Sequence, residues 1–353
     1  MDHRTASPCR GAQVKNPFST VLKFSRMARK GRPLSAALLM QSAFLSASTA
    51  AARSPRKTKG KSLGTERPGP GSFVEDVYSC TRGSLRYRLY TPTGSTHRQL
   101  PLIVMLHGCT QSAMDFSVGT DMNRLADELG FLVLYPEQST RANPNRCWNW
   151  HRPSNQTRGS GEAAVIAGMT RHILGRCRGH TGRVYIAGIS AGGAMAAVIA
   201  AAYPRLYVAV GIHSGVPIGT IGTIGEALTA MRGRAPTQVG KTAPPLPMIL
   251  FHGDSDRVVH PVNADGFVGQ LRRSSARDLT ARSEQGVAPG GRAFTRTSYR
   301  YDQGPVMLEE WTVHGSGHAW SGGNRAGTHT DPGGPDASRA MATFFLARRR
   351  KAG

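Results

Sequence analysis

Residues 183–204 read RVYIAGISAGGAMAAVIAAAYP, and this stretch decides the fold. Residues 184–186 are a short β-branched and aromatic run, which is typical of a strand buried on both faces of a parallel sheet. The turn Gly-Ile-Ser-Ala-Gly follows at 188–192, and the alanine-rich residues after it predict a helix that stops near Tyr203-Pro204. A strand, a sharp turn around a central serine and a helix together indicate a nucleophile elbow, with Ser190 as the nucleophile. The alternative is a glycine-rich turn that contains an incidental serine.

Strand and helix patterns alternate along much of the chain. Residues 84–90 (SLRYRLY) alternate as a half-exposed edge strand does, and residues 102–106 form a continuous apolar run typical of a central strand. Further strands are predicted at 131–135, 207–212, 248–251 and 307–313, and helices at about 122–129, 160–177 and 335–346. This order predicts a three-layer α/β-hydrolase fold with a mostly parallel central sheet. The excursion at 217–247 is expected to be a lid or a cap.

Charge and composition divide the 353-residue chain into three parts. The formal net charge is +24, and residues 1–70 carry +12 of it, because 14 Lys and Arg face only Asp2 and Glu66. Residues 53–72 lack an apolar period and predict a linker, so residues 1–72 are expected to be a largely disordered basic leader. A catalytic domain is expected at 73–347 and a basic tail at 348–353. The charge attracts polyanions weakly, and no specific nucleic-acid partner is expected.

The leader contains a Leu- and Ala-rich segment at residues 33–52 with basic residues before it. It fits either a secretory signal with a long basic region or an amphipathic helix, since serines and Gln41 interrupt its apolar run. An extracellular or cell-envelope location is therefore expected, with the cytoplasm as the alternative. No run approaches the roughly 18 apolar residues that a membrane span needs, so no transmembrane span is expected.

Five cysteines stand at positions 9, 80, 109, 147 and 177, and no two form a C-x-x-C pair. A zinc site is therefore not expected, and neither a metal nor a cofactor is implied. Cys109 and Cys147 lie in loops that would meet if both crossed the edge of the sheet. They are expected to form a disulfide or to remain two buried thiols.

Four polar turns follow predicted strands: residues 107–111 (HGCTQ), the turn at Ser190, residues 252–256 (HGDSD) and residues 314–320 (HGSGHAW). In open α/β sheets the carboxyl ends of the strands gather the catalytic groups. Serine, acid and histidine then follow one another in the chain order of this fold.

A serine hydroxyl needs an imidazole base, and the imidazole needs an acceptor that fixes its tautomer. His318 is the predicted base, because its glycine-rich loop can fold back over the sheet. His314 is expected to be structural, and His329 lacks support from a strand. His260 stands too near residues 252–256, the turn that contains the candidate acids and is called the acid turn below.

Two aspartates compete for the role of the acid. Asp256 is favoured because the loop after a strand must project its carboxylate sideways toward the histidine. Asp254 would then stabilise the turn through local backbone hydrogen bonds.

The oxyanion of an acyl-transfer intermediate needs two aimed N–H donors. Ala191, at the start of the helix, is expected to supply one. Cys109 is the best candidate for the other and Thr110 the next, since Gly108 permits close approach.

Three tryptophans stand near these turns. Trp148, Trp150 and Trp320 are expected either to line a substrate groove or to pack in the core, and for Trp320 the groove is favoured.

Nine segments together resemble the poly(3-hydroxybutyrate) depolymerase family of esterases between about residue 74 and residue 347. They are LHGCTQSAMDF, YPEQ, NRCWNW, RGSGEAAVIAGMTRH, GISAGGAMAAVIAAAYP, HSGVPIG, FHGDSDRVVHPVNAD, HGSGHAWSGG and TDPGGPDASRAMATFFL. The resemblance implies an α/β-hydrolase that needs no cofactor, with a triad on Ser190, Asp256 and His318. It also implies substrates among polyhydroxyalkanoates or related short-acyl esters, and it gives the export signal some support.

The sequence thus predicts a serine esterase that acts through an acyl-enzyme on a polymeric, oligomeric or small ester. A feruloyl or acetylxylan esterase is the alternative enzyme, because such enzymes are relatives of this family. An alternative of another class is a basic polyanion- or surface-binding protein on an inactive hydrolase scaffold. The oligomeric state is not set by the sequence.

Overall fold

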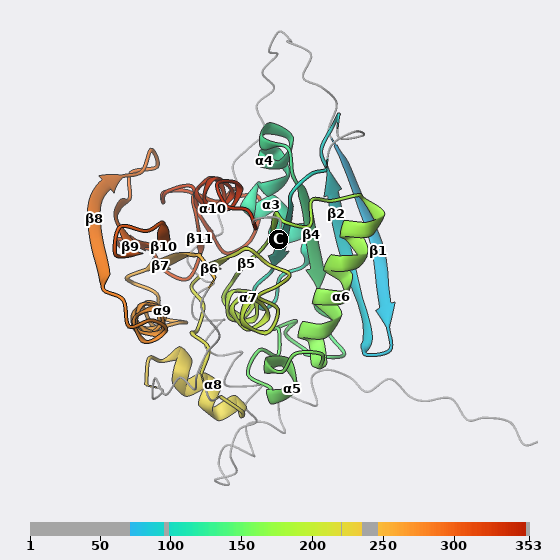
Figure 1. Cartoon of the computed structure of the whole chain (residues 1–353), viewed down its shortest axis with the longest axis horizontal. Helices are drawn as coiled ribbons and strands as arrows, with labels where there is room; N and C mark the ends of the chain where they lie inside the picture. The colour runs from blue at the N-terminus through green and yellow to red at the C-terminus, as the bar shows by residue number, and fades with distance from the viewer. Residues whose placement is uncertain (1–70, 95–98, 220, 235–245, 351–353) are drawn as a thin grey trace, which may run out of the picture. The chain divides into compact units, whose positions relative to one another are not determined.

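A ten-stranded mixed sheet organises the protein in this computed structural model, which describes residues 71–94, 99–219, 221–234 and 246–350 (Figure 1). The strand order is β1-β2-β4-β3-β5-β6-β7-β10-β9-β8. The strands are β1 Ser72–Cys80, β2 Gly83–Thr91, β3 Leu102–Leu106, β4 Leu132–Glu137, β5 Val184–Ile189, β6 Ala209–His213, β7 Met248–Gly253, β8 Leu279–Val287, β9 Ala293–Tyr301 and β10 Val306–Val313. Two short strands, β11 Trp320–Ser321 and β12 Thr330–Asp331, form a separate pair.

The six middle strands, from β4 to β10, pair in parallel, and an antiparallel pair of strands extends the sheet on each side. β3, β5 and β6 are buried along their whole length, as expected for parallel strands that are covered on both faces. The predicted α/β-hydrolase fold with a mostly parallel sheet is confirmed.

Helices cover both faces of the sheet (Figure 1). The helices are α3 Ala113–Thr120, α4 Met122–Leu129, α5 Pro153–Gln156, α6 Gly161–Arg176, α7 Ala191–Ala202, α8 Ile224–Met231, α9 Val262–Arg273 and α10 Ala337–Leu346. α4 and α10 contact each other and share one apolar core with β3, β4 and β5, while α6 and α7 contact each other on the other layer. In that core the rings of Tyr185 and Phe345 stack with their centroids 5.1 Å apart.

Two edge features differ from the sequence predictions. β2 is not an edge strand, because β1 pairs along its outer side from Ser72 to Cys80. The antiparallel hairpin of β8 and β9 was not predicted, and it extends the sheet beyond β10. Most of the side chains of β1 and β8 are exposed, so neither segment has the strong apolar signal of a central strand.

The predicted helices are confirmed within a few residues. α4 ends at Leu129. The N–H of the next residue, Gly130, donates to the carbonyl of Ala126 (2.9 Å), and the positive φ of Gly130 (73°) turns the chain out of the helix. α6 begins after Ser160, although the Ser160 side chain makes no capping hydrogen bond. The excursion at 217–247 contains α8, and its residues 235–245 lie outside the described residues.

The leader, its segment at 33–52 and most of the linker also lie outside the described residues. Within the described part of the chain, no helix combines the length and the apolar character that crossing a membrane requires. The basic residues at 348–350 contact the domain: Arg348 donates to the carbonyl of Val306 (3.0 Å) and Arg350 to that of Tyr207 (3.1 Å).

Candidate active site

Ser190 stands on a strained turn between β5 and α7. Its φ of 58° and ψ of −123° are unusual for a residue with a side chain, and its N–H donates to the carbonyl of His213 on β6 (2.9 Å). Glycine is required on both sides, because a Cβ on Gly188 or Gly192 would overlap backbone atoms, including the carbonyl oxygen of Leu106. The geometry is that of a nucleophile elbow.

The four turns singled out in the sequence gather at one edge of the sheet. They follow β3, β5, β7 and β10, and these four strands are parallel and separated only by β6 between β5 and β7. Neighbouring strands lie about 4.8 Å apart, so the turns are within reach of one another's side chains. The loop that carries His318, residues 314–320, is called the base loop. It packs tightly on the acid turn, because a Cβ on Gly253 would overlap the carbonyl of Ser316.

Asp256 and His318 form a buried pair. His318 Nδ1 lies 2.7 Å from Asp256 Oδ2, and the exposed fractions of the two side chains are 4% and 0%. The other carboxylate oxygen of Asp256 accepts hydrogen bonds from the N–H groups of Val258 (2.8 Å) and Val259 (2.9 Å). Burial raises the pKa of Asp256, but the nearby His318, its hydrogen bond and these backbone donors outweigh burial and hold the pKa at about 2. The carboxylate is therefore ionised and aimed at His318.

Two further histidines of this edge are buried beside the pair and were not predicted from the sequence. His213, at the end of β6, accepts a hydrogen bond from the N–H of Ser321 (3.0 Å) and stacks between Phe251 and Trp320. His252, at β7, lies with Nε2 3.6 Å from Asp256 Oδ2 and 2.8 Å from the carbonyl of Val259. Burial lowers the pKa of His213 to about 3 and also lowers the pKa of His252, so both rings are neutral. Their positions at strand ends, each followed by a small residue, were the available sequence signal.

Asp254 pairs with His314 rather than with His318. His314 Nδ1 lies 2.9 Å from Asp254 Oδ2, the N–H of Gly315 donates to the other oxygen (2.8 Å), and His314 Nε2 is 2.9 Å from Thr295 Oγ1. Both side chains are about 40% exposed. Asp254 thus ties the acid turn to the base loop. The backbone N–H that its carboxylate binds is that of Gly315 in the base loop and not one of its own turn, as the sequence had suggested.

The other two histidines considered for the base contribute to loops. His260 accepts from the N–H of Val262 (3.2 Å), beyond the acid turn. The carbonyl of His329 accepts from the N–H of Trp320 (2.7 Å), where β11 and β12 pair.

The loop after β3 lies directly against Ser190. A Cβ placed on Gly108 would be 3.6 Å from the Cβ of Ser190, so this glycine allows the close approach. The N–H of Thr110 donates to the carbonyl of Asn145 (2.6 Å), whereas in the described part of the chain the N–H groups of Cys109 and Ala191 donate to no other residue. Cys109 and Ala191 therefore keep the two donors that an oxyanion would need.

Cys109 and Cys147 form a disulfide in the structure, with an S–S distance of 2.04 Å. It joins the loop after β3 to the loop after β4. Buried polar contacts support the second loop: Glu162, in the first turn of α6, accepts from the side chain of Gln138 (2.8 Å) and from the backbone N–H of Asn149 (3.0 Å). The loop after β4 is thereby held both by the disulfide and by its hydrogen bonds to α6, and through the disulfide it restrains the loop after β3 beside Ser190.

The three tryptophans are buried, with exposed fractions of 1% for Trp148, 5% for Trp150 and 1% for Trp320. Trp148 donates to the carbonyl of His107 (3.1 Å), and Trp320 donates to Ser338 Oγ (2.9 Å). This burial favours core packing over a groove wall, and for Trp320 that is a correction of the favoured prediction. Trp320, at the end of the base loop, stacks its ring on the buried His213 and so anchors this loop to β6.

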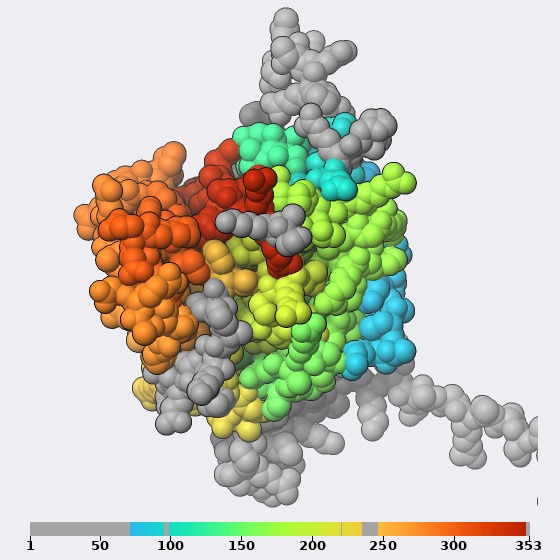
Figure 2. All heavy atoms as spheres, viewed as in Figure 1, coloured from blue at the N-terminus to red at the C-terminus, as the bar shows by residue number. Residues whose placement is uncertain are grey.

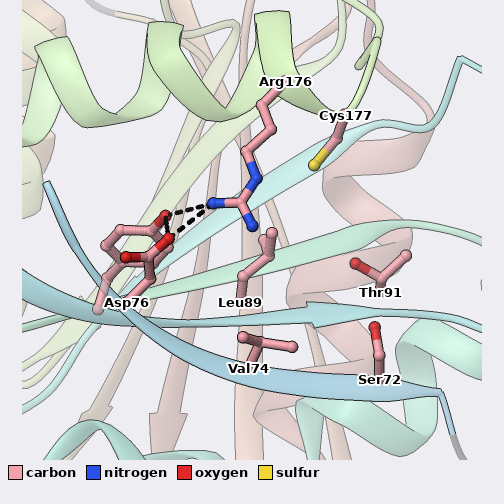
Figure 3. A pocket seen from close by; sticks show the side chains of 8 residues that line it. Ser72, Val74, Asp76, Leu89, Thr91, Arg176 and Cys177 are labelled. Carbon is pink, nitrogen blue, oxygen red and sulfur yellow. Dashed lines mark hydrogen bonds and ion pairs between the residues drawn. The ribbon is translucent and has the colours of Figure 1, made fainter.

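A shallow pocket of about 130 Å³ lies away from these turns, between β1, β2 and the end of α6 (Figure 3). Within it Arg176 bonds Asp76 (2.8 Å) and the hydroxyl of Tyr87 (3.1 Å), so its charged groups satisfy one another. The described residues contain no group of three or more His, Cys, Asp or Glu that could hold a metal ion.

Comparison with known proteins agrees with this geometry. Residues 85–286 match the family described as esterase PHB depolymerase. The chain belongs to this family. It is 32% identical over 263 residues to poly(3-hydroxyalkanoate) depolymerase C of Paucimonas lemoignei. The match covers 71% of this chain and 60% of the relative. It is 30% identical over 236 residues to feruloyl esterase B of Thermothelomyces thermophilus, covering 62% of this chain and 78% of the relative.

Among solved structures, the acetyl xylan esterase from Aspergillus awamori superposes with a TM-score of 0.52 at 20% sequence identity, covering 66% of this chain and 89% of that one. At this identity the likeness shows the fold alone. The predicted family resemblance is confirmed, while the chain spans only 60% of the length of the depolymerase it matches.

Proposed function

We propose that this protein is a serine esterase with Ser190 as the nucleophile, His318 as the general base and Asp256 as the acid. The buried 2.7 Å contact between His318 and Asp256, at the sheet edge where the strained serine turn stands, carries the proposal. An ionised carboxylate at Nδ1 keeps the proton on that nitrogen and leaves Nε2 to act as the base.

In the proposed reaction Ser190 Oγ attacks the ester carbonyl while His318 takes its proton. The tetrahedral oxyanion accepts hydrogen bonds from the N–H groups of Cys109 and Ala191, and His318 returns the proton to the leaving alcohol. Water then hydrolyses the acyl-enzyme by the same route. Removing one oxyanion donor typically costs about 3 kcal/mol of transition-state stabilisation.

For the substrate we propose a short-acyl ester of the polyhydroxyalkanoate type, as polymer or oligomer. The support is the depolymerase relative at 32% identity. Esters of feruloyl or acetyl groups on polysaccharide are the second candidate, supported by the feruloyl esterase relative at 30% identity. Turnover of hydroxybutyrate oligomers, methyl ferulate and acetylated xylan, compared as kcat/KM, distinguishes them.

We also propose an extracellular or cell-envelope location. The disulfide between Cys109 and Cys147 supports it, because disulfides persist in oxidising compartments. Detection of the processed protein outside the cytoplasm, with the leader removed up to about residue 52, is the expected result.

The decisive test of the activity is Ser190→Ala with p-nitrophenyl butyrate as the substrate. We expect turnover to disappear, together with labelling by a fluorophosphonate probe, while the circular dichroism spectrum stays unchanged. Unchanged turnover in this variant would end the proposal. A wild-type protein that neither hydrolyses any ester nor takes up the probe would instead favour a basic surface-binding protein on this scaffold.

A further inference from the structure

β8 forms an open edge of the sheet. It pairs with β9 on one side, and no described strand pairs on its other side. Figure 1 shows it at the outer left of the sheet, and Figure 2 shows this hairpin, in orange, as one flank of the domain. All of its residues except Leu279 and Gly286 are exposed, and Val287 is 70% exposed. Its outward backbone N–H and carbonyl groups are a template for a further strand.

The sequence of β8, LTARSEQGV, is complementary to itself about its central residue. In a two-fold antiparallel pair, residues that face each other point to the same side of the sheet. Since side chains alternate between the two sides, one residue must then face its own copy, and the axis lies between these two copies. We name each axis by this residue. With the axis at Ser283, the middle of the nine-residue strand, every residue of β8 finds a partner. Arg282 then faces Glu284 of the second copy, and Glu284 faces its Arg282.

No other axis gives this match. An axis at Arg282 places two arginines opposite each other, and an axis at Glu284 places two glutamates opposite each other. An axis two residues to either side of Ser283 separates Arg282 from Glu284 altogether. The Ser283 register also brings the exposed Val287 onto Leu279, which adds an apolar contact at each end.

The charged side chains are available for this contact. Arg282 is exposed and makes no ion pair in the described part of the chain, while Glu284 remains 59% exposed although it accepts from Arg296 (2.8 Å). Charges of one sign on an edge strand would repel a second copy. Opposite charges placed symmetrically about the centre attract it instead.

The opposite edge of the sheet lacks this complementarity. The centre of β1 is Asp76, so self-pairing would bring two aspartates together, and this carboxylate is already bonded to Arg176 and Tyr87 (Figure 3). The two edges therefore differ in what they can bind.

We propose that β8 is a homodimer interface, in which two copies of this chain join their sheets by antiparallel pairing around Ser283. The inference is independent of the proposed esterase activity, because β8 carries none of the catalytic residues.

Charge reversal tests the register. Sedimentation velocity of the full chain across a wide concentration range should show a reversible dimer. Arg282→Glu and Glu284→Arg should each raise the dissociation constant about tenfold or more, because like charges then meet at both symmetric positions. The double variant carrying both changes should recover the wild-type constant within about threefold. Arg300→Glu, on the neighbouring strand β9, is the matched control and should leave the constant unchanged.

A cross-link tests the two-fold axis directly. Facing residues in an antiparallel pair have Cα atoms about 4.5–5.5 Å apart, which suits a disulfide. In a background where Cys9, Cys80 and Cys177 are serine, Ser283→Cys should give a covalent dimer on mild oxidation. Gln285 is also exposed and lies on the same face, but in the proposed dimer it faces Ala281, so Gln285→Cys should give no such cross-link. A protein that sediments as a monomer at every concentration, or equal cross-linking of the two cysteine variants, would overturn the proposal.

Discussion

Two aspartate–histidine pairs connect the same two strands, β7 and β10, and they differ mainly in burial. Asp254 and His314 follow directly on the last register pair, Gly253 with Val313, and both are about 40% exposed. Asp256 and His318 lie further along the same turns, with exposed fractions of 0% and 4%. The contact distances are similar, at 2.9 Å and 2.7 Å.

The surroundings of the carboxylates explain why one pair suits chemistry and the other suits structure. Burial raises the pKa of both aspartates, but it is outweighed by hydrogen bonds at Asp254 and by the charge interaction and hydrogen bond with His318 at Asp256. Only Asp256 is shielded from water, and its pKa is held at about 2. A charge interacts more strongly with its partner where water is excluded. The buried pair can therefore stabilise a developing imidazolium, whereas the exposed pair mainly joins two loops.

The largest effect that separates the pairs should come from the histidines. His318→Ala should lower kcat for p-nitrophenyl butyrate by about 10⁵- to 10⁶-fold, the scale seen when the base of a catalytic triad is removed. His314→Ala removes an equivalent ring from the other pair and should keep kcat within about tenfold, because it contacts no reacting group. Equal losses in the two variants would contradict the assignment of the base.

The aspartates should differ by less. Asp256→Asn keeps the shape of the side chain but offers an amide where His318 needs an acceptor, so the ring turns to the wrong tautomer. We expect kcat to fall by about 10⁴-fold, as in other triads. The reaction should retain its substrate KM within a few fold. A drop of similar size in Asp254→Asn would show that the acid had been placed on the wrong aspartate.

Low pH should lower the free energy of unfolding through two histidines that are buried at the carboxyl ends of β6 and β3. Burial lowers the pKa of His213 to about 3 and that of His107 to about 4, both below the usual value of 6.5 for the unfolded chain. As the pH falls below about 6.5 the unfolded chain binds these protons first, so stability present above that pH is lost on the way down to about pH 4. For each of the two rings, the free energy of unfolding should fall by about 1.4 kcal/mol for every unit that the pH drops within this window.

Urea unfolding at pH 7 and pH 5 measures this loss, expected at about 2 kcal/mol for each of the two histidines. His213→Gln has no titrating ring and should remove its share of the slope. A variant with the wild-type slope would mean that His213 is protonated equally in the folded and unfolded chains. The window lies above the titration of Asp256, which therefore adds nothing to it.

The elbow and the parallel strands were predictable because each is encoded by a contiguous pattern in the chain. β8 and β9 were not. Most residues of β8 are exposed and those of β9 are mostly half-buried, so neither strand is a continuous apolar run, and the place of the hairpin is set by the pairing of β9 with β10. The sequence favoured Asp256 as the partner of His318, but it did not predict the second pair, Asp254 with His314. That pair depends on the register between β7 and β10, which no local pattern contains. Likewise, the position of Trp320 near the base did not reveal that its ring turns inward onto His213.

The smallest effect should be the stability change in Asp254→Asn. The substitution weakens the hydrogen bonds that Asp254 accepts from His314 and Gly315, and at an exposed site we expect a loss of about 1 kcal/mol in the free energy of unfolding. Asp302→Asn is a matched control, because the Asp302 side chain makes no hydrogen bond within the described residues, and it should change stability by less than about 0.5 kcal/mol.

Salt then separates the two pairs. Since mobile ions screen exposed charges far more than buried ones, the loss in Asp254→Asn should shrink in about 1 M salt. The loss of kcat in Asp256→Asn should persist under the same conditions, because it arises from a bond that solvent ions do not reach. If salt rescued Asp256→Asn instead, the Asp256–His318 pair would have to be open to solvent, and the contrast between the two pairs would disappear.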